Sequence, residues 1–214
     1  MKLFRNCIND ATCVGTLSSN FSYDHEAYGK KYYKATLDMA RTSGTVDRIW
    51  VVVPENEIDP CVNYYGIRVM VRGSFSSHGY FDEIGKHHMK LFLKSYDIKY
   101  GVEEDDFNEI VLSGYLCKNP IYRVTDSREI ADILVACNRR FSVSYIPCIL
   151  WGYNARDVSR YFGKGQMIRV SGRIQSRWYQ KKLDNGDIEE KVAYEVSVNR
   201  IFEEVQNNND IYEN

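Results

Sequence analysis

Residues Gly165–Tyr179 read GQMIRVSGRIQSRWY, and this stretch decides how the rest of the chain is interpreted. Ile168, Val170 and Ile174 alternate with polar residues, which is the period-two pattern of a half-buried β-strand. The polar face carries arginines and the strand closes on two aromatic residues. These are Arg169, Arg173, Arg177, Trp178 and Tyr179. Core packing does not explain this outward row of arginines. We therefore expect the row to act at the protein surface.

An earlier stretch, Gly66–Tyr80, reads GIRVMVRGSFSSHGY and follows the same plan. Gly73 and Gly172 stand 99 positions apart, and so do Gly15 and Gly114. Between these glycines, KYYKATLDMAR matches REIADILVACNR and DRIWVVVPE matches YIPCILWGY at nearly the same offset. A constant offset with matching strands between indicates two copies of one structural unit.

The acidic run at residues 103–106 is the expected boundary between the two units. With 214 residues and 44% hydrophobic residues, the chain is long enough for two small domains. We therefore predict an N-terminal barrel over residues 1–104, a C-terminal barrel over residues 105–205 and a short polar tail over residues 206–214.

Each unit contains five short strand patterns separated by turn signals. In the second unit a helix is predicted from Asn154, as its N-cap, to Phe162, with Ala155, Val158 and Phe162 on one apolar face and Gly163 as the stop signal. Five strands with a helix between the third and fourth form the OB barrel. The predicted fold class is therefore all-β, two tandem five-stranded OB barrels, the second with a short helix between strands three and four. Residues 54–63 of the first unit are expected to form a loop instead.

Composition excludes several classes of protein. The six cysteines contain no CxxC pair and the four histidines lack metal-ligand spacing, so we predict no metal, no cofactor and no disulfide framework. We read the cysteines as small buried residues. The N-terminus lacks a signal-peptide pattern and no apolar run is long enough to cross a membrane, so a cytoplasmic location is expected.

Charge is distributed unevenly along the chain although the net charge is only −1. Residues 118–182 hold 13 Lys and Arg against four acids, whereas residues 183–214 hold nine acids against two bases. The P-loop, GxSxG and HExxH motifs are all missing, so no enzyme activity is predicted. Aromatic residues interleave with the arginines in the second unit, which is the pattern of a surface that stacks the bases of a single nucleic-acid strand and contacts its phosphates.

The second unit also resembles a known family. Residues 108–202 resemble the bacterial single-stranded DNA-binding proteins through VLSGYLCKNP, IADILVACNRRF, ILWGYNARDVSRYFGKGQMIRVSGRIQSRWY and YEVSVN. The resemblance implies largely sequence-independent binding of single-stranded DNA in replication, recombination and repair, near the nucleoid. It also implies a homodimer that brings four barrels together, with replication or repair proteins as possible partners.

The resemblance places the family's stacking aromatics at four positions and basic contacts beside them. The predicted nucleic-acid-binding residues are Phe141, Tyr145, Trp151, Tyr179, Trp178, Arg139, Arg140, Arg173 and Arg177. Trp178 departs from the family, which commonly has a basic residue there, and strand alternation puts it on the opposite side from Arg177 and Tyr179.

The first unit has lost most of this set. The repeat offset turns the stacking positions into Ser43, Asp47, Val53 and Tyr80, and turns Arg177 into His78. We therefore expect the first barrel to be mainly a structural or dimer-forming copy with a degenerate binding face. A relocated face could use Tyr32, Tyr33, Phe75, Tyr80 and Phe81.

Two alternatives stay open at this point. Family members tend to end in an acidic tail with a terminal aromatic residue that recruits enzymes, whereas this chain ends QNNNDIYEN. A primosome-type module that uses its barrels mainly for protein contacts is therefore one alternative. An RNA-binding protein of the cold-shock type is the other, although its motifs are not matched.

Overall fold

The structure is a computed structural model that describes residues 7–83, 85–139, 142–182 and 186–202. Nearly all of its regular structure is β-strand, which confirms the predicted fold class. The strands of the N-terminal half are β1 (Asn9–Leu17), β2 (Ser22–Ala27), β3 (Lys30–Ala40), β4 (Val46–Pro54), β5 (Arg68–Phe81) and β6 (His87–Tyr100). Those of the C-terminal half are β7 (Phe107–Leu116), β8 (Ile121–Val124), β9 (Glu129–Arg139), β10 (Ser142–Trp151), β11 (Met167–Lys182) and β12 (Ile188–Phe202).

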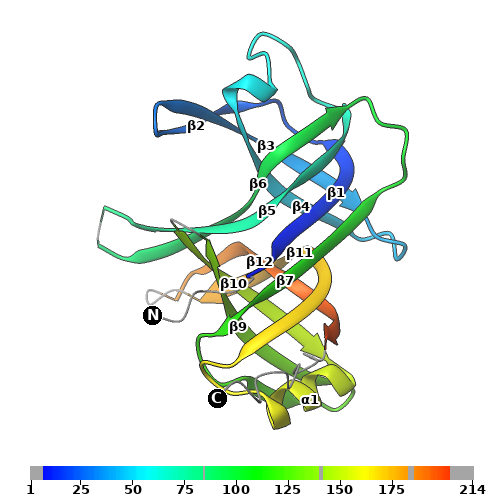
Figure 1. The fold of residues 1–214 in the computed structure, drawn as a ribbon, viewed down its shortest axis with the longest axis vertical. Coiled ribbons are helices and arrows are strands. Elements are labelled where there is room, and N and C mark those ends of the chain that lie inside the picture. The colour runs from blue at the N-terminus through cyan, green and yellow to red at the C-terminus, as the bar shows by residue number, and fades with distance from the viewer. Residues whose placement is uncertain (1–6, 84, 140–141, 183–185, 203–214) are drawn as a thin grey trace, which may run out of the picture.

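The strands form one sheet of twelve strands that closes into two barrels. The order is β2-β3-β4-β6-β5-β1-β7-β11-β12-β10-β9-β8, and the additional pairs β3–β1 and β7–β9 close the two ends. Each barrel contains one parallel pair, β4 with β6 in the first barrel, where Val51 lies opposite Leu93, and β10 with β12 in the second, where Cys148 lies opposite Val196. Figure 1 shows the first barrel above the second, with the helix α1 (Gly152–Tyr161) at the far end of the second barrel.

Four glycines occupy the places where strands approach most closely. A Cβ atom at Gly15 would overlap the carbonyl oxygen of Asp38, and one at Gly114 would overlap that of Ala136. Gly73 and Gly172 lie at β-bulges, against β6 and β12 respectively, where a Cβ would again overlap a carbonyl oxygen. All four positions therefore need glycine, because a side chain would overlap the backbone of the neighbouring strand.

The repeat extends to side-chain contacts. The Asn9 side chain donates to the carbonyl of Phe75 (2.7 Å) and accepts the Phe75 N–H (2.9 Å). Asn108 makes the same two hydrogen bonds with Ile174, at 2.7 and 2.9 Å. Asn9 and Asn108 stand 99 positions apart, and so do Phe75 and Ile174. The contact between β1 and β5 of the first barrel is therefore repeated between β7 and β11 of the second.

The helix of the second barrel differs from the prediction at its start. It begins at Gly152, whose φ of 55° is favourable for glycine, and Trp151 is its N-cap. Asn154 lies inside the first turn and its side chain donates to the carbonyl of Asn199 (3.0 Å), so it is not the cap. Ala155 and Val158 are buried against the barrel as the periodicity predicted. In the first barrel the predicted loop over residues 54–63 contains a single 3₁₀ turn at Glu55–Glu57.

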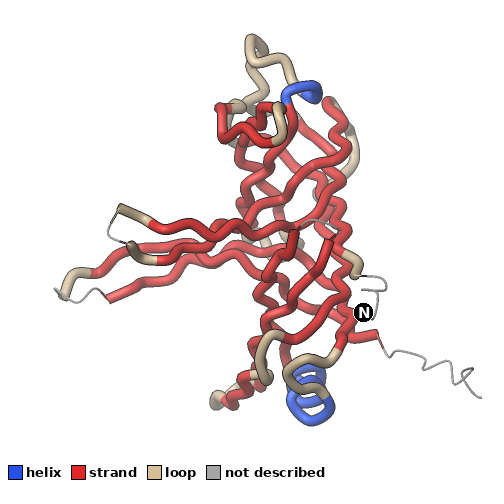
Figure 2. The backbone as a smooth tube through the Cα atoms, turned by 60° about the vertical axis from the view of Figure 1, so that its left-hand side comes forward, coloured by secondary structure: helices blue, strands red, loops and turns tan. Residues whose placement is uncertain are grey.

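The barrels meet through an antiparallel pairing of their first strands. β1 and β7 pair from Asn9 opposite Leu112 to Val14 opposite Phe107. This pairing relates the two units by an approximate two-fold axis. Figure 2 shows the long β5–β6 and β11–β12 hairpins projecting to the same side of the molecule beside this junction. Strand β5 contacts β10 of the second barrel, and β11 contacts β4 of the first barrel, so each hairpin contacts the other barrel.

All six cysteines lie in the described residues as thiols rather than disulfides, and half of them are buried. Cys13, Cys137 and Cys148 are buried, whereas Cys61 is exposed in the loop before β5. Burial and the charge of Asp47 raise the pKa of Cys13 to about 12, which keeps it a neutral thiol. Interpretation of the cysteines as small buried residues is thus confirmed for these three positions and wrong for Cys61.

Candidate nucleic-acid interface

The sheet of β10, β12 and β11 has one face in the barrel core and one outside. Ile174, Val196 and Cys148 are paired across the three strands and are buried inside. Because side chains alternate along a strand, residues an odd number of positions away from these three point outward. These outward residues include Tyr145, Trp151, Arg177 and Tyr179, which we call the stacking face. The structure thus brings four of the predicted binding residues to one side of one sheet.

Arg177 and Tyr179 form the part of the stacking face on the β11–β12 hairpin. The guanidinium of Arg177 lies 5.9 Å from the centre of the Tyr179 ring, and Tyr179 is 38% exposed. Glu195 on β12 lies 3.6 Å from Arg177 Nε. The ring and the cation are therefore adjacent and open to solvent, which is the arrangement that a stacked base and its phosphate require.

Tyr145 lies in the first half of β10, at the edge of the first barrel. Its side chain is 46% exposed and its backbone N–H donates to Ser77 Oγ of β5 (2.7 Å). The hydrogen bond fixes the backbone of this position against the neighbouring barrel. A base stacked on Tyr145 would therefore lie at the junction of the two barrels.

Trp151 lies at the other end of β10, beside the start of α1. Arg128 lies 5.7 Å from the centre of the Trp151 ring, and the two border a hollow of about 300 Å³. Arg156 on the rim pairs with Glu129 (2.5 Å), and this hydrogen bond lowers the pKa of the Glu129 carboxyl. The ring is half-buried, so one side remains accessible from the hollow.

Arg173 does not lie in the open part of the face. It is half-buried where β11 meets the first barrel, and burial together with nearby Arg41 lowers its pKa. Gln175 is the next outward residue of β11. It is buried, and its side chain donates to the Glu195 carboxylate (2.8 Å). The outer row of β11 that the sequence predicted is thus interrupted, because the first barrel covers its middle.

β11 is also tied to β4 of the first barrel by two hydrogen bonds of Ser176, which lines the same hollow as Trp178. The Ser176 N–H donates to Asp47 Oδ1 (3.0 Å), and Ser176 Oγ accepts the Arg48 N–H (3.0 Å). Asp47 is 1% exposed and also accepts both Arg41 Nε (2.7 Å) and Nη2 (2.5 Å). Asp47 stands at the position equivalent to Tyr145, one of the predicted stacking residues, and instead holds the two barrels together.

Trp178 points away from the stacking face, as alternation predicted. It is 70% exposed and borders a hollow of about 250 Å³ together with Val46, Arg48, Val192 and Tyr194. Arg140 and Phe141 lie outside the described residues, and of Arg139 only the backbone, at the end of β9, is described. The binding roles of all these positions stay predictions.

The uneven charge along the chain is partly compensated in space. The register of the β11–β12 hairpin sets Lys181 opposite Glu189 and Gln180 opposite Glu190. The basic stretch and the start of the acidic stretch are therefore neighbouring strands of one hairpin. Among the described residues no helix is long and apolar enough to cross a membrane, and no group of three His, Cys, Asp or Glu side chains is placed to hold a metal ion.

Sequence reasoning missed the surface of the first barrel beside the junction. The proposed relocated face fails at Phe75, which is fully buried. Instead, exposed Tyr28 at the β2–β3 turn stands near Tyr80 and Lys94 of the β5–β6 hairpin, and all line or border one groove. The Tyr28-Gly29 turn was visible in the sequence, but the meeting of this turn with a hairpin some fifty residues later was not.

Together, these features define a class: a tandem OB-barrel protein with aromatic and basic residues on the outer face of its second barrel. Residues 107–204 match the Single-strand binding protein family. Single-stranded DNA-binding protein B of Bacillus subtilis is 36% identical over 36% of this chain and 74% of its own length. The chain belongs to the single-strand binding protein family.

Other relatives agree with the family assignment. Single-stranded DNA-binding protein 2 of Listeria monocytogenes is 34% identical over 48% of this chain and 67% of its own length. The chain spans only 57% of the length of the Clostridium tetani single-stranded DNA-binding protein, to which it is 36% identical. The family match, over residues 107–204, falls on the second barrel.

A solved structure covers both barrels. The single-stranded DNA binding protein from Thermus aquaticus superposes with a TM-score of 0.72 over 92% of this chain and 93% of its own, at 17% identity. At that identity the likeness concerns the fold alone, and it supports the tandem-barrel architecture.

Proposed function

We propose that this chain binds single-stranded DNA with little dependence on sequence and carries out no catalysis. The observation that carries the proposal is the stacking face, where Tyr145, Trp151 and Tyr179 share one side of a sheet with Arg177. Aromatic rings stack on any base, and arginine meets the phosphates. The names of the relatives, single-stranded DNA-binding proteins, support the same ligand.

The proposal includes the wider setting in which such proteins work. We propose roles in DNA replication, recombination and repair, a cytoplasmic location at the nucleoid, and a homodimer that presents four barrels. The division into residues 1–104, 105–205 and 206–214 is proposed on the same basis. The primosome-type alternative is not favoured, because the family match and the relatives name single-strand binding instead.

Fluorescence titration with dT oligomers tests the proposal. Trp151→Ala and Tyr179→Ala together should weaken binding by about 1–3 kcal/mol for each ring, since each ring stacks one base. Tyr161→Ala is the matched control, because Tyr161 is 69% exposed at the end of α1 and lies off the stacking face. A wild-type protein that does not bind dT, or a double variant with wild-type affinity, would contradict the site.

A further inference from the structure

A groove of about 690 Å³ lies at the junction of the barrels, beside the stacking face. One wall is the end of β2 and its turn, Asp24–Tyr28, and another is the β5 segment from Ser76 to Tyr80. The third wall is Ser142–Ser144 of the second barrel. We call it the junction groove. Segments far apart in the sequence thus combine to form a single concave surface.

Tyr28 stands at the rim of the junction groove in an unusual state. Its φ is 53°, a left-handed backbone conformation that bulky residues rarely adopt, and its side chain is 98% exposed. The following Gly29 also has a positive φ, so the pair forms the tight turn between β2 and β3. An aromatic ring held here contributes no packing to the fold, which points to a contact outside the protein.

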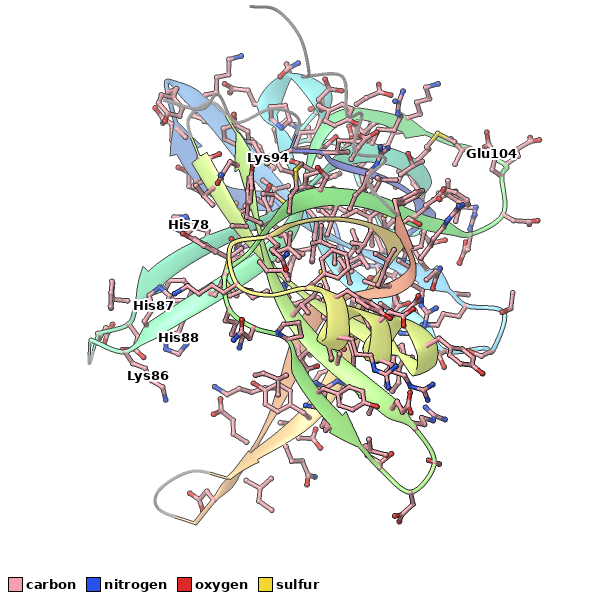
Figure 3. All side chains as sticks on the ribbon, turned by 60° about the horizontal axis from the view of Figure 1, so that its bottom comes forward. His78, Lys86, His87, His88, Lys94 and Glu104 are labelled. Carbon is pink, nitrogen blue, oxygen red and sulfur yellow. The ribbon has the colours of Figure 1, made fainter. Side chains whose placement is uncertain are left out.

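A second ring faces the groove from the β5–β6 hairpin. Tyr80 is 47% exposed and lies stacked on His88, with ring centres 5.3 Å apart and planes at 20°. His88 is held from the side by Asp82, 2.6 Å from its Nε2. Figure 3 shows Lys86, His87, His88 and His78 following one another along this hairpin toward Lys94. The stack fixes the plane of the Tyr80 ring while leaving its other side open.

Charge inside the junction groove is close to balanced. Asp24 is paired with Lys90 (2.8 Å), Lys34 (3.0 Å) and His25 (2.8 Å), so its negative charge is neutralised locally. Lys94 lies 4.9 Å over the Tyr32 ring. Glu26 is the remaining acid among the lining residues. Open rings without a strong excess of cations suit the uncharged, flat bases of a nucleic acid better than its phosphates.

The groove continues the stacking face of the second barrel. Val143, which lines the groove, lies on the same side of β10 as Tyr145, and the Tyr145 N–H is hydrogen-bonded to Ser77 of the opposite wall. A strand that stacks a base on Tyr145 therefore reaches the groove without leaving the surface. The second contact would be intramolecular and would add to affinity at little cost.

We propose that the junction groove binds bases of the same single strand, stacked on Tyr28 and Tyr80, so that one strand runs from the second barrel onto the first. This inference rests on the proposed function and extends it. The first barrel, which keeps an aromatic residue at only one of the four equivalent stacking positions, Tyr80, contributes through that ring on its β5–β6 hairpin together with Tyr28 of its β2–β3 turn.

The test uses the full-length chain with Tyr28→Ala and Tyr80→Ala combined, titrated with dT oligomers of increasing length. Both positions are exposed, so the variant should fold, which its melting temperature checks. Short oligomers that fill only the stacking face should bind the variant as they bind wild type. Long oligomers should bind the variant about tenfold or more weakly, because two bases no longer have a ring to stack on. Tyr161→Ala, exposed at the far end, should match wild type at every length.

The outcomes separate this inference from the proposed function. Wild-type protein that fails to bind any dT would overturn both. Wild-type affinity of the variant for long oligomers would overturn the groove alone, and would leave it as a surface for a protein segment. Photocrosslinking of bromodeoxyuridine oligomers to Tyr28 or Tyr80, read by mass spectrometry, would support the proposal directly.

Discussion

Gly172 shows how a single residue constrains the second barrel. In β11 it faces the backbone of β12, and a Cβ atom at this position would overlap the carbonyl oxygen of Ser197. Backbone cannot move aside as a flexible side chain can. The glycine therefore lets β12 cross β11 at the bulge where Ser171 and Gly172 shift register.

Gly172→Ala should lower the free energy of unfolding by about 1–3 kcal/mol, the usual cost of forcing an extra carbon into a packed site. Denaturant unfolding measures the change. Gly163→Ala is the matched control, since the nearest atom to a Cβ there lies 3.5 Å away. Equal stability of the two variants would show that β12 can shift without cost.

At the scale of elements, Asp24 ties three strands of the first barrel together. From β2 it reaches Lys34 on β3 and Lys90 on β6, and it also pairs with its neighbour His25. Burial alone would raise the pKa of this carboxyl, but the hydrogen bonds from Lys90, His25 and Lys34 outweigh burial and hold it well below its ordinary value of 3.8.

Asp24→Asn should therefore destabilise the protein in a pH-dependent way. A carboxyl whose folded pKa is depressed stabilises the fold fully above its unfolded pKa and loses that effect as pH falls. We expect the variant to be less stable than wild type by about 1–3 kcal/mol at neutral pH, with the difference shrinking below about pH 4. Denaturant unfolding across that range measures it.

The control for Asp24 is an exposed ion pair. Asp132→Asn removes the partner of Arg123, which is half-exposed, and should cost at most about 1 kcal/mol. A stability difference for Asp24→Asn that stays constant down to strongly acidic pH would contradict the role assigned to its charge.

The elements also show what the sequence could predict. The period-two alternation and the glycine spacing predicted both barrels, because each pattern is local or repeats at a fixed offset. The N-cap of helix α1 was predicted three residues late, at Asn154 instead of Trp151, since Gly152 begins the helix with a positive φ that no residue pattern signals. Ala155 and Val158 still marked its buried face correctly.

The candidate site was predictable only where it depends on one strand. Alternation alone placed Arg177 and Tyr179 on one side and Trp178 on the other. Burial of Arg173 could not be foreseen, because it depends on how the first barrel docks against β11. The junction groove was missed for the same reason, since Tyr28, Tyr80 and Ser144 meet only in the assembled molecule.

At the scale of the whole molecule, charge gives little long-range attraction for a polyanion. The net charge is −1 and the isoelectric point is about 6.4. Within the β11–β12 hairpin, acids of β12 face the basic strand, and Glu195 lies 3.6 Å from Arg177. Attraction for phosphates must therefore come from a few locally placed cations, and each should contribute measurably to the salt dependence of binding.

Arg177→Ala should flatten the dependence of dT binding on salt. On single strands the slope of log K against log salt changes by about 0.7 for each phosphate that the protein no longer neutralises, because fewer counterions are released. Tyr179→Ala should weaken binding with the slope unchanged, since stacking releases no counterion. Titrations across a series of KCl concentrations measure both slopes. If the slope for Arg177→Ala equals that of wild type, Arg177 neutralises no phosphate. The phosphate contacts would then come from other cations.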